Sequence, residues 1–282
     1  GTTMPTPHNN ANKGDFAKSL ELAQKMMQNT DTTSLIGRDY LYYARVLGKN
    51  NMAAEALVQY ENAIAKDTAN VALYKEMAEV AEKANLTDQA ISYYTDYIQK
   101  GGEEVKIADY FSLGQTYYIA ASAFLPQDNT PLSEADSLKM MPYALAADSL
   151  FGYVAERVPD SYMGNFWRAR TNSVIDHLST AGLAKPYYEK AIELIDPEKN
   201  PKQLLEAYRY MAYYYYLQED RDNSLKYCDL ILGMAPVARG GGRSDGDATL
   251  LLLRHPVHGS STVVGFADLM VYARIVQNTF RC

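Results

Sequence analysis

The stretch YLYYARVLGKNNMAAEALVQY, residues 40–60, is followed 34 residues later by YKEMAEVAEKANLTDQAISYY, residues 74–94. The two stretches align without a gap and share aromatic and small residues at four places. The matching pairs are Tyr40 and Tyr74, Ala44 and Ala78, Ala56 and Ala90, and Tyr60 and Tyr94. A period of 34 residues is typical of stacked helix–turn–helix repeats. The sequence therefore predicts an all-α solenoid, a fold whose extended surfaces usually serve binding.

These residues resemble the motif of the tetratricopeptide repeat (TPR) family. That motif places an aromatic, a large apolar and a small residue in its first helix, and a small residue and an aromatic in its second. Further matches begin at Tyr110, Phe166 and Tyr208 and extend the resemblance over about residues 15–236. The resemblance implies a right-handed superhelix of about five helical hairpins. The expected repeats are about 37–70, 71–104, 107–160, 162–199 and 201–236.

The third repeat carries an insertion at about residues 120–146. Its motif residues Gly114 and Ala147 are 33 apart, whereas the equivalent residues of the first two repeats are 12 apart, so about 21 residues are added. We expect an extended first helix, a loop near 125–130, and a lengthened second helix that is kinked or restarted at Pro142. Thr130 and Pro131 resemble an N-cap followed by proline at the first helical position.

The two ends of the chain differ from the repeats. Residues 1–13 are polar and contain two prolines, so we predict that they are disordered. From Asp15 to about Gln28 the apolar spacing predicts an amphipathic helix, which looks like the second helix of a hairpin whose first half lies outside this sequence.

The composition changes after Pro236. Residues 1–236 contain 15 Lys and 15 Glu, whereas residues 237–282 contain neither, and instead carry five Arg and a Gly-Gly-Gly run. Three interpretations of this tail stay open: a foreign or frame-shifted stretch, an atypical capping segment, and the beginning of a second domain. The apolar spacing over 263–280 predicts a helix that covers the last hairpin.

The charge and cysteine content exclude several classes of function. A net charge of −7 and a pI near 5.2 argue against a nucleic-acid surface, which needs clustered Lys and Arg. No apolar run approaches the roughly 20 residues of a transmembrane helix. The two cysteines, Cys228 and Cys282, make no disulfide framework, and Cys228 occupies the aromatic core position of the fifth repeat.

One motif suggests chemistry. Arg254 and His255 follow four leucines and resemble the opening motif of the histidine phosphatase family, which implies a histidine that takes up a phosphoryl group. Only 27 residues follow His255, which leaves no room for the rest of that fold. His255 and His258 could bind a metal adventitiously, but no Cys or carboxylate cluster lies near them. We therefore predict no enzyme, no cofactor and no designed metal site.

The resemblance also implies a binding groove. In TPR proteins, residues of the first helix of each repeat line the inner surface, and in the fifth repeat Tyr213 and Tyr216 should face the groove while Tyr215 packs in the core. The alternative is that these tyrosines only pack between layers. Carried over residue by residue, the candidate partner-binding positions are Arg38, Arg45, Lys75, Glu79, Glu82, Gln115, Tyr118, Arg209, Tyr213 and Tyr216.

Our first hypothesis is a non-catalytic scaffold that binds a peptide or a helix of a protein partner in this groove. The second is an assembly module of a larger chain that acts through its ends and the 120–146 insertion, with possible self-association. The third, a phosphatase-like enzyme, depends on Arg254 and His255 alone. The stretch FWRAR at 166–170 resembles bacterial envelope-associated TPR proteins, which implies the periplasm or cell envelope, with the cytoplasm as the alternative.

Overall fold

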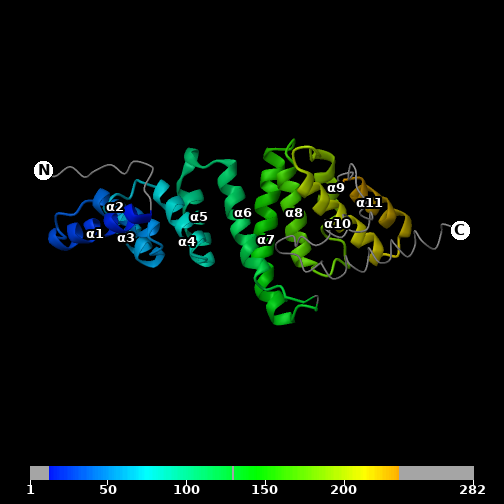
Figure 1. The fold of residues 1–282 in the computed structure, drawn as a ribbon, viewed down its shortest axis with the longest axis horizontal. Helices are drawn as coiled ribbons and strands as arrows, with labels where there is room; N and C mark the ends of the chain where they lie inside the picture. The colour runs from blue at the N-terminus through cyan, green and yellow to red at the C-terminus, as the bar shows by residue number, and fades with distance from the viewer. Residues whose placement is uncertain (1–12, 129, 235–282) are drawn as a thin grey trace, which may run out of the picture. The chain divides into compact units, whose positions relative to one another are not determined.

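The computed structural model describes residues 13–128 and 130–234, and in this part of the chain every regular element is a helix (Figure 1). The all-α prediction is confirmed. One short 3₁₀ helix, Gly102–Glu104, accompanies eleven α-helices. They are α1 (Lys13–Asn29), α2 (Gly37–Lys49), α3 (Ala53–Lys66), α4 (Ala72–Lys83), α5 (Thr87–Lys100), α6 (Ile107–Ser122), α7 (Glu134–Arg157), α8 (Tyr162–Ile175), α9 (Lys185–Leu194), α10 (Pro201–Leu217) and α11 (Arg221–Gly233).

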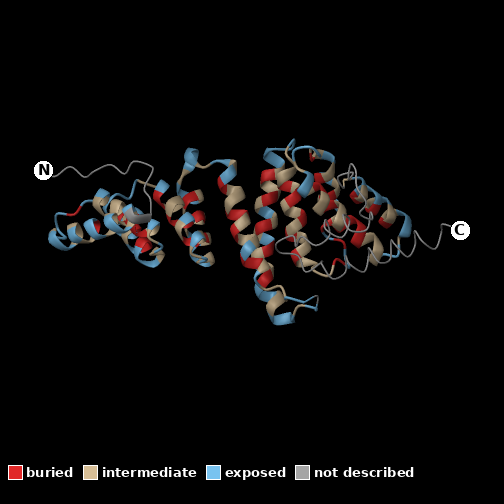
Figure 2. Ribbon diagram, viewed as in Figure 1, coloured by how far each residue is buried: buried red, intermediate tan, exposed pale blue. Residues whose placement is uncertain are grey.

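From α2 onward the helices pack as five consecutive hairpins: α2 with α3, α4 with α5, α6 with α7, α8 with α9, and α10 with α11. The chain divides into two compact units, residues 1–109 and 110–282, which we call the N-terminal and C-terminal units. In both, buried residues follow the sides of the helices that pack against neighbours (Figure 2). The exact repeat boundaries stay predictions.

In the N-terminal unit the core consists of the residues that repeat in the sequence. Ala44, Ala56, Ala78 and Ala90 are all 0% exposed. Alanine at these crossings lets the helix axes approach closely, because it adds only a methyl group between them. The aromatic rings at the equivalent positions 60 and 94 are also buried and fill the spaces between helices.

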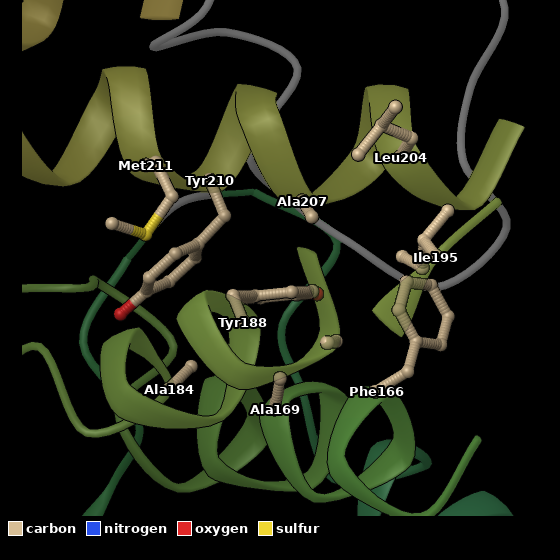
Figure 3. Packing of buried hydrophobic residues seen from close by; sticks show 10 residues of the cluster. Phe166, Ala169, Ala184, Tyr188, Ile195, Leu204, Ala207, Tyr210 and Met211 are labelled. Atoms are coloured by element: carbon tan, nitrogen blue, oxygen red, sulfur yellow. The ribbon is translucent and has the colours of Figure 1, made fainter. Parts of the chain in front are cut away.

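The C-terminal unit has a larger aromatic core between α8, α9 and α10. The ring of Tyr188 lies between Phe166 and Tyr210, with centroid distances of 5.9 and 4.8 Å (Figure 3). Gly164 of α8 allows a close approach to α7, since an added Cβ would lie 2.6 Å from the backbone nitrogen of Ala155. The ring contacts link α8 to α10 through α9, and the contact at Gly164 holds α8 against α7.

The insertion lies between α6 and α7. The predicted cap at Thr130 is wrong, because α7 begins at Glu134 and the hydroxyl of Ser133 accepts its capping hydrogen bond from the backbone N–H of Asp136 at 3.1 Å. The hydroxyl of Thr130 instead donates to Asp128, at 2.7 Å. Pro142 lies inside the continuous helix α7 and does not start a new one.

The starts of α1 and α10 lie close to the positions that the sequence predicts. Helix α1 spans Lys13–Asn29, close to the predicted 15–28. Helix α10 begins at Pro201 as expected, but the side chain of Asn200 does not cap it and accepts a hydrogen bond from the Tyr162 hydroxyl at 3.0 Å. The predictions for residues 1–12 and for the tail, including Arg254, His255, His258 and the helix at 263–280, lie outside the described residues.

Candidate protein-interaction surfaces

In the N-terminal unit, the predicted groove residue Arg45 forms part of a three-residue cluster. Its guanidinium donates two hydrogen bonds to the carboxylate of Glu76 on α4, at 2.9 and 2.6 Å. The hydroxyl of Tyr60 on α3 donates to the same carboxylate at 3.0 Å. We call Arg45, Tyr60 and Glu76 the first Arg–Tyr–Glu cluster. It joins α2, α3 and α4, so it links one hairpin to the next.

Two of the other predicted residues of this unit also contact neighbouring side chains. Lys75 contacts the buried Asp109 at 2.6 Å, and the second carboxylate oxygen of Asp109 accepts from the backbone N–H of Lys106 at 2.7 Å. Glu82 accepts a hydrogen bond from the Tyr94 hydroxyl at 3.1 Å. The positions 38 and 79 are exposed to solvent.

The C-terminal unit contains a second cluster with the same three residue types in the same arrangement. Arg170 of α8 donates two hydrogen bonds to the carboxylate of Glu206 on α10, at 2.7 and 2.6 Å. The hydroxyl of Tyr188 on α9 donates to Glu206 at 3.1 Å. Arg170, Tyr188 and Glu206 form the second Arg–Tyr–Glu cluster, which is the more buried of the two.

Burial and hydrogen bonding change the acid–base behaviour of both clusters. Burial lowers the pKa of the Arg170 guanidinium, but its hydrogen bonds to Glu206 and the negative charge of that carboxylate together outweigh burial, so its pKa is raised. Burial raises the pKa of Tyr188 well above its usual value, and the charge of Glu206 adds to that rise. The pKa of Tyr60 is raised for the same reasons, with Glu76 as the charged neighbour. Each tyrosine therefore stays a neutral donor at physiological pH.

An aromatic surface adjoins the second cluster. The guanidinium of Arg170 lies 4.7 Å from the ring centroid of Trp167, within cation–π range. Trp167 in turn makes edge contacts with Tyr118 of α6, at 5.3 Å, and with Phe111, at 5.7 Å. The predicted residue Tyr118 is thus in direct contact with α8. Gln115 lies on the same helix and is partly buried.

Helix α10 continues this surface. Arg209 lies near Glu206, and burial lowers the pKa of its guanidinium although the Glu206 carboxylate opposes that shift. Tyr213 is buried, with 7% of its surface exposed, and its ring stacks on that of Tyr216 at 6.5 Å. We call the partly exposed surface of Tyr118, Trp167, Arg170, Arg209 and Tyr216 on three successive first helices the α6–α8–α10 face. Partner binding by these residues stays a prediction.

Sequence reasoning identified Arg45 but missed most other members of the two clusters and their surroundings, Tyr188 among them. Tyr60 was assigned to the core, and Glu76, Arg170 and Trp167 were not among the candidate positions. A signal existed for the pairs, since Arg45 and Glu76 are 31 residues apart and Arg170 and Glu206 are 36 apart. Both separations are close to one repeat, which brings opposite charges onto neighbouring first helices.

The described residues contain no grouping that could hold a metal ion and no membrane-spanning helix. Among residues 13–128 and 130–234, no three His, Cys, Asp or Glu side chains are grouped so that they could hold a metal ion. Cys228 is buried, and burial raises the pKa of its thiol to about 11. None of the described helices has both the length and the apolar character that crossing a membrane requires.

Helical hairpins stacked in this way define a helical-repeat protein with extended surfaces. The structure is similar to the C-terminal part of a TPR repeat-containing protein from Cytophaga hutchinsonii, with 26% identity, 83% of this chain and 81% of that chain covered, and a TM-score of 0.61. It also matches YrrB, described as a TPR protein with an unusual peptide-binding site, at 14% identity, 84% and 96% coverage and a TM-score of 0.47. A third match is a thermophilic TPR protein of Thermus thermophilus, at 15% identity, 83% and 99% coverage and a TM-score of 0.43.

Neither a protein-family model nor a curated protein matches the sequence. The similarity to the Cytophaga structure agrees with the sequence motif and supports a TPR-type helical-repeat fold for this chain. Proteins of this fold are in general protein–protein interaction scaffolds and are typically not catalytic.

Proposed function

We propose that the chain is a non-catalytic scaffold and that its C-terminal unit binds a peptide or a short helix of a protein partner on the α6–α8–α10 face. The observation that carries this proposal is the continuous series of contacts from Tyr118 to Trp167, from Trp167 to Arg170, and from Arg170 to Glu206 beside Arg209. Tyr, Trp and Arg are the residues that most often dominate binding energy at protein interfaces.

The second Arg–Tyr–Glu cluster holds this face in place before a partner arrives. Arg170 is fixed by two hydrogen bonds to Glu206 and by its position over Trp167. A side chain that is already ordered loses little conformational entropy on binding. Because the carboxylate of Glu206 already accepts bonds from Arg170 and Tyr188, we expect the partner to bind mainly through apolar and aromatic contacts.

Trp167 makes a direct test possible, because it is the only tryptophan of the chain. Peptides would be selected on the full chain from a random library, and their binding measured by the change in Trp167 fluorescence. We expect selected peptides to shift the emission of Trp167, and we expect Tyr118→Ala and Arg209→Ala each to weaken binding by about tenfold or more, the range of interface anchor residues.

The matched control is Lys190→Ala with Glu193→Ala, an exposed ion pair on α9 at 2.7 Å that lies outside the α6–α8–α10 face. This control should bind the peptides as the wild type does, and circular dichroism should show that all variants keep their helices. Peptides that bind without changing Trp167 emission, and with equal affinity for every variant, would place the binding surface elsewhere.

A second role, assembly through the insertion, is supported by a different observation. The outward side of α7 is exposed and carries large apolar residues.

A further inference from the structure

The outward side of α7 carries a stripe without charge. Its members, Ala135, Leu138, Pro142, Leu145 and Ser149, are all exposed, and Leu138 has 70% and Leu145 55% of its surface open to solvent. The opposite side of the same helix holds the buried core residues Met140, Ala144, Ala147 and Phe151. A surface helix normally presents polar and charged residues on the side away from the core. We call the five exposed residues the α7 stripe.

The spacing of the α7 stripe indicates what kind of element fits it. Its residues follow one another at intervals of three, four, three and four, which is the a/d pattern of a coiled coil. Both leucines fall at the same type of position, seven residues apart. An apolar seam of this period accepts the side chains of another α-helix, whose period it matches.

We propose that the α7 stripe pairs with the α7 stripe of a second copy of the chain, antiparallel about a two-fold axis near Pro142. Two-fold symmetry is the commonest closed arrangement of identical subunits, and it requires one surface to be complementary to itself. The stripe meets this requirement, because Leu138 lies four residues before Pro142 and Leu145 three residues after it. An antiparallel copy therefore places Leu138 opposite Leu145 of the partner subunit.

The charges beside the α7 stripe agree with this pairing. Lys139 is an exposed cation at one edge, and in the antiparallel register the nearest residue on that edge of the partner subunit is Ala146, not a second lysine. At the other edge, the residue of the partner subunit nearest to Asp148 is Glu134. The charge of Asp148 is already balanced, because its carboxylate accepts two hydrogen bonds from Arg168 at 3.0 and 2.9 Å. The register therefore brings together no pair of unbalanced like charges among these residues.

The length of the stripe sets the expected affinity. Four turns of one helix bury less surface than the roughly 1,200 Å² of a stable standard interface, so the dimer belongs to the weak, transient class. The chain's net charge of −7 also opposes association at low ionic strength. We therefore expect a reversible dimer that strengthens when salt is added.

The test is the oligomeric state of the full chain, measured by sedimentation velocity from about 5 µM to about 500 µM, the range in which an interface of this size dissociates. The wild type should pass from monomer to dimer over this range. The L138E/L145E variant should stay monomeric, with a dissociation constant raised about 100-fold or more, because two buried leucines are replaced by charges. The matched control is L22E/V58E, which changes residues that are 56% and 52% exposed on α1 and α3 and should leave the dimer unchanged.

Disulfide trapping tests the register. In a C282S background, mild oxidation should link the L138C/L145C variant into a covalent dimer, while L138C alone and L145C alone should link far less. Unchanged circular dichroism would show that each variant is folded. The proposal is overturned if the wild type is monomeric at every concentration, if L138E/L145E still dimerises, or if the single-cysteine variants link as well as the double variant.

Discussion

Glu206 and Glu76 each accept three hydrogen bonds from the same types of partner, two from an arginine and one from a tyrosine. The two carboxylates differ in burial, since the Glu206 side chain is 13% exposed and the Glu76 side chain 32%. The chain therefore contains the same interaction in two environments. The comparison separates the effect of the contact from the effect of desolvation.

We predict that Glu206→Gln lowers the free energy of unfolding by about 2–3 kcal/mol, because it leaves the half-buried Arg170 charge without its carboxylate. Glu76→Gln should cost only about 0.5–1 kcal/mol, since solvent screens the more exposed Arg45. Urea denaturation of both variants beside the wild type measures the difference. Equal losses in the two variants would mean that burial does not decide the strength of these clusters.

The buried tyrosines make stability depend on pH in the alkaline range. Burial, followed by nearby carboxylates, raises the pKa of Tyr60, Tyr94 and Tyr188 in the folded chain, and raises that of Tyr93 to about 12. In the unfolded chain, tyrosine ionises near pH 10. Above that pH the unfolded state releases protons that the folded state keeps, so the free energy of unfolding falls as the pH rises.

We therefore predict full stability from these groups below about pH 9.5 and a progressive loss between about pH 10 and pH 12. A titration of tyrosinate absorbance should show a first group that ionises near pH 10 and a second that ionises only as circular dichroism reports unfolding. The same titration in concentrated urea should show a single step. A single step near pH 10 in the folded chain, without unfolding, would contradict the prediction.

Among the structural elements, the hairpins could be predicted from the sequence because their core positions repeat. Ala44 and Ala78 could be predicted as contact points, since only a small residue fits where two helices cross. The start of α7 could not be predicted from the sequence, because two caps are plausible. One is Thr130, which precedes a proline, and the other is Ser133, which precedes two acidic residues in the first turn. Which one is used depends on where α7 can pack, and that is a tertiary property.

The polar contacts between helices were predicted less well than the core. Arg45 was identified from its position on the first helix, but its bond to Glu76 requires the side-chain geometry of two hairpins. Helix α10 begins at Pro201, where the fifth repeat was expected to start, yet the side chain of Asn200 accepts a hydrogen bond from the Tyr162 hydroxyl and does not cap the helix. Helix spacing determines which faces are apolar, whereas the partner of a polar side chain depends on the stacking of the next repeat.

Two glycines near the contact of α7 and α8 give opposite predictions. Gly164→Ala should lower stability by about 1–3 kcal/mol, because its new Cβ would lie 2.6 Å from the backbone of Ala155 and the helices would have to separate. Gly152→Ala should raise stability by about 0.5–1 kcal/mol, since its Cβ would meet only Arg168 at 3.6 Å and glycine weakens a helix interior. Thermal denaturation measures both changes, and a gain in stability for Gly164→Ala would refute the close approach of α7 and α8.

At the scale of the whole molecule, each unit has its own hydrophobic core. The core around Met77 joins helices α2 to α5, and the core around Tyr188 joins α8, α9 and α10. In repeat proteins, stability is approximately a sum of repeat energies and nearest-neighbour terms, so a local defect lowers the protection of its own region first. This property can be measured by amide hydrogen exchange.

We predict that Met77→Ala, which leaves a cavity at a side chain that is 1% exposed, accelerates exchange in α2 to α5 and leaves α8 to α11 close to the wild-type rates. Gly164→Ala should accelerate exchange in α8 to α11 and leave α2 to α5 close to the wild-type rates, because it disturbs only the packing of α7 against α8. The two variants are controls for each other, since each should leave the exchange rates of the other unit unchanged. If either substitution accelerates exchange equally in both units, the chain opens as a single cooperative body, and the nearest-neighbour description does not apply to it.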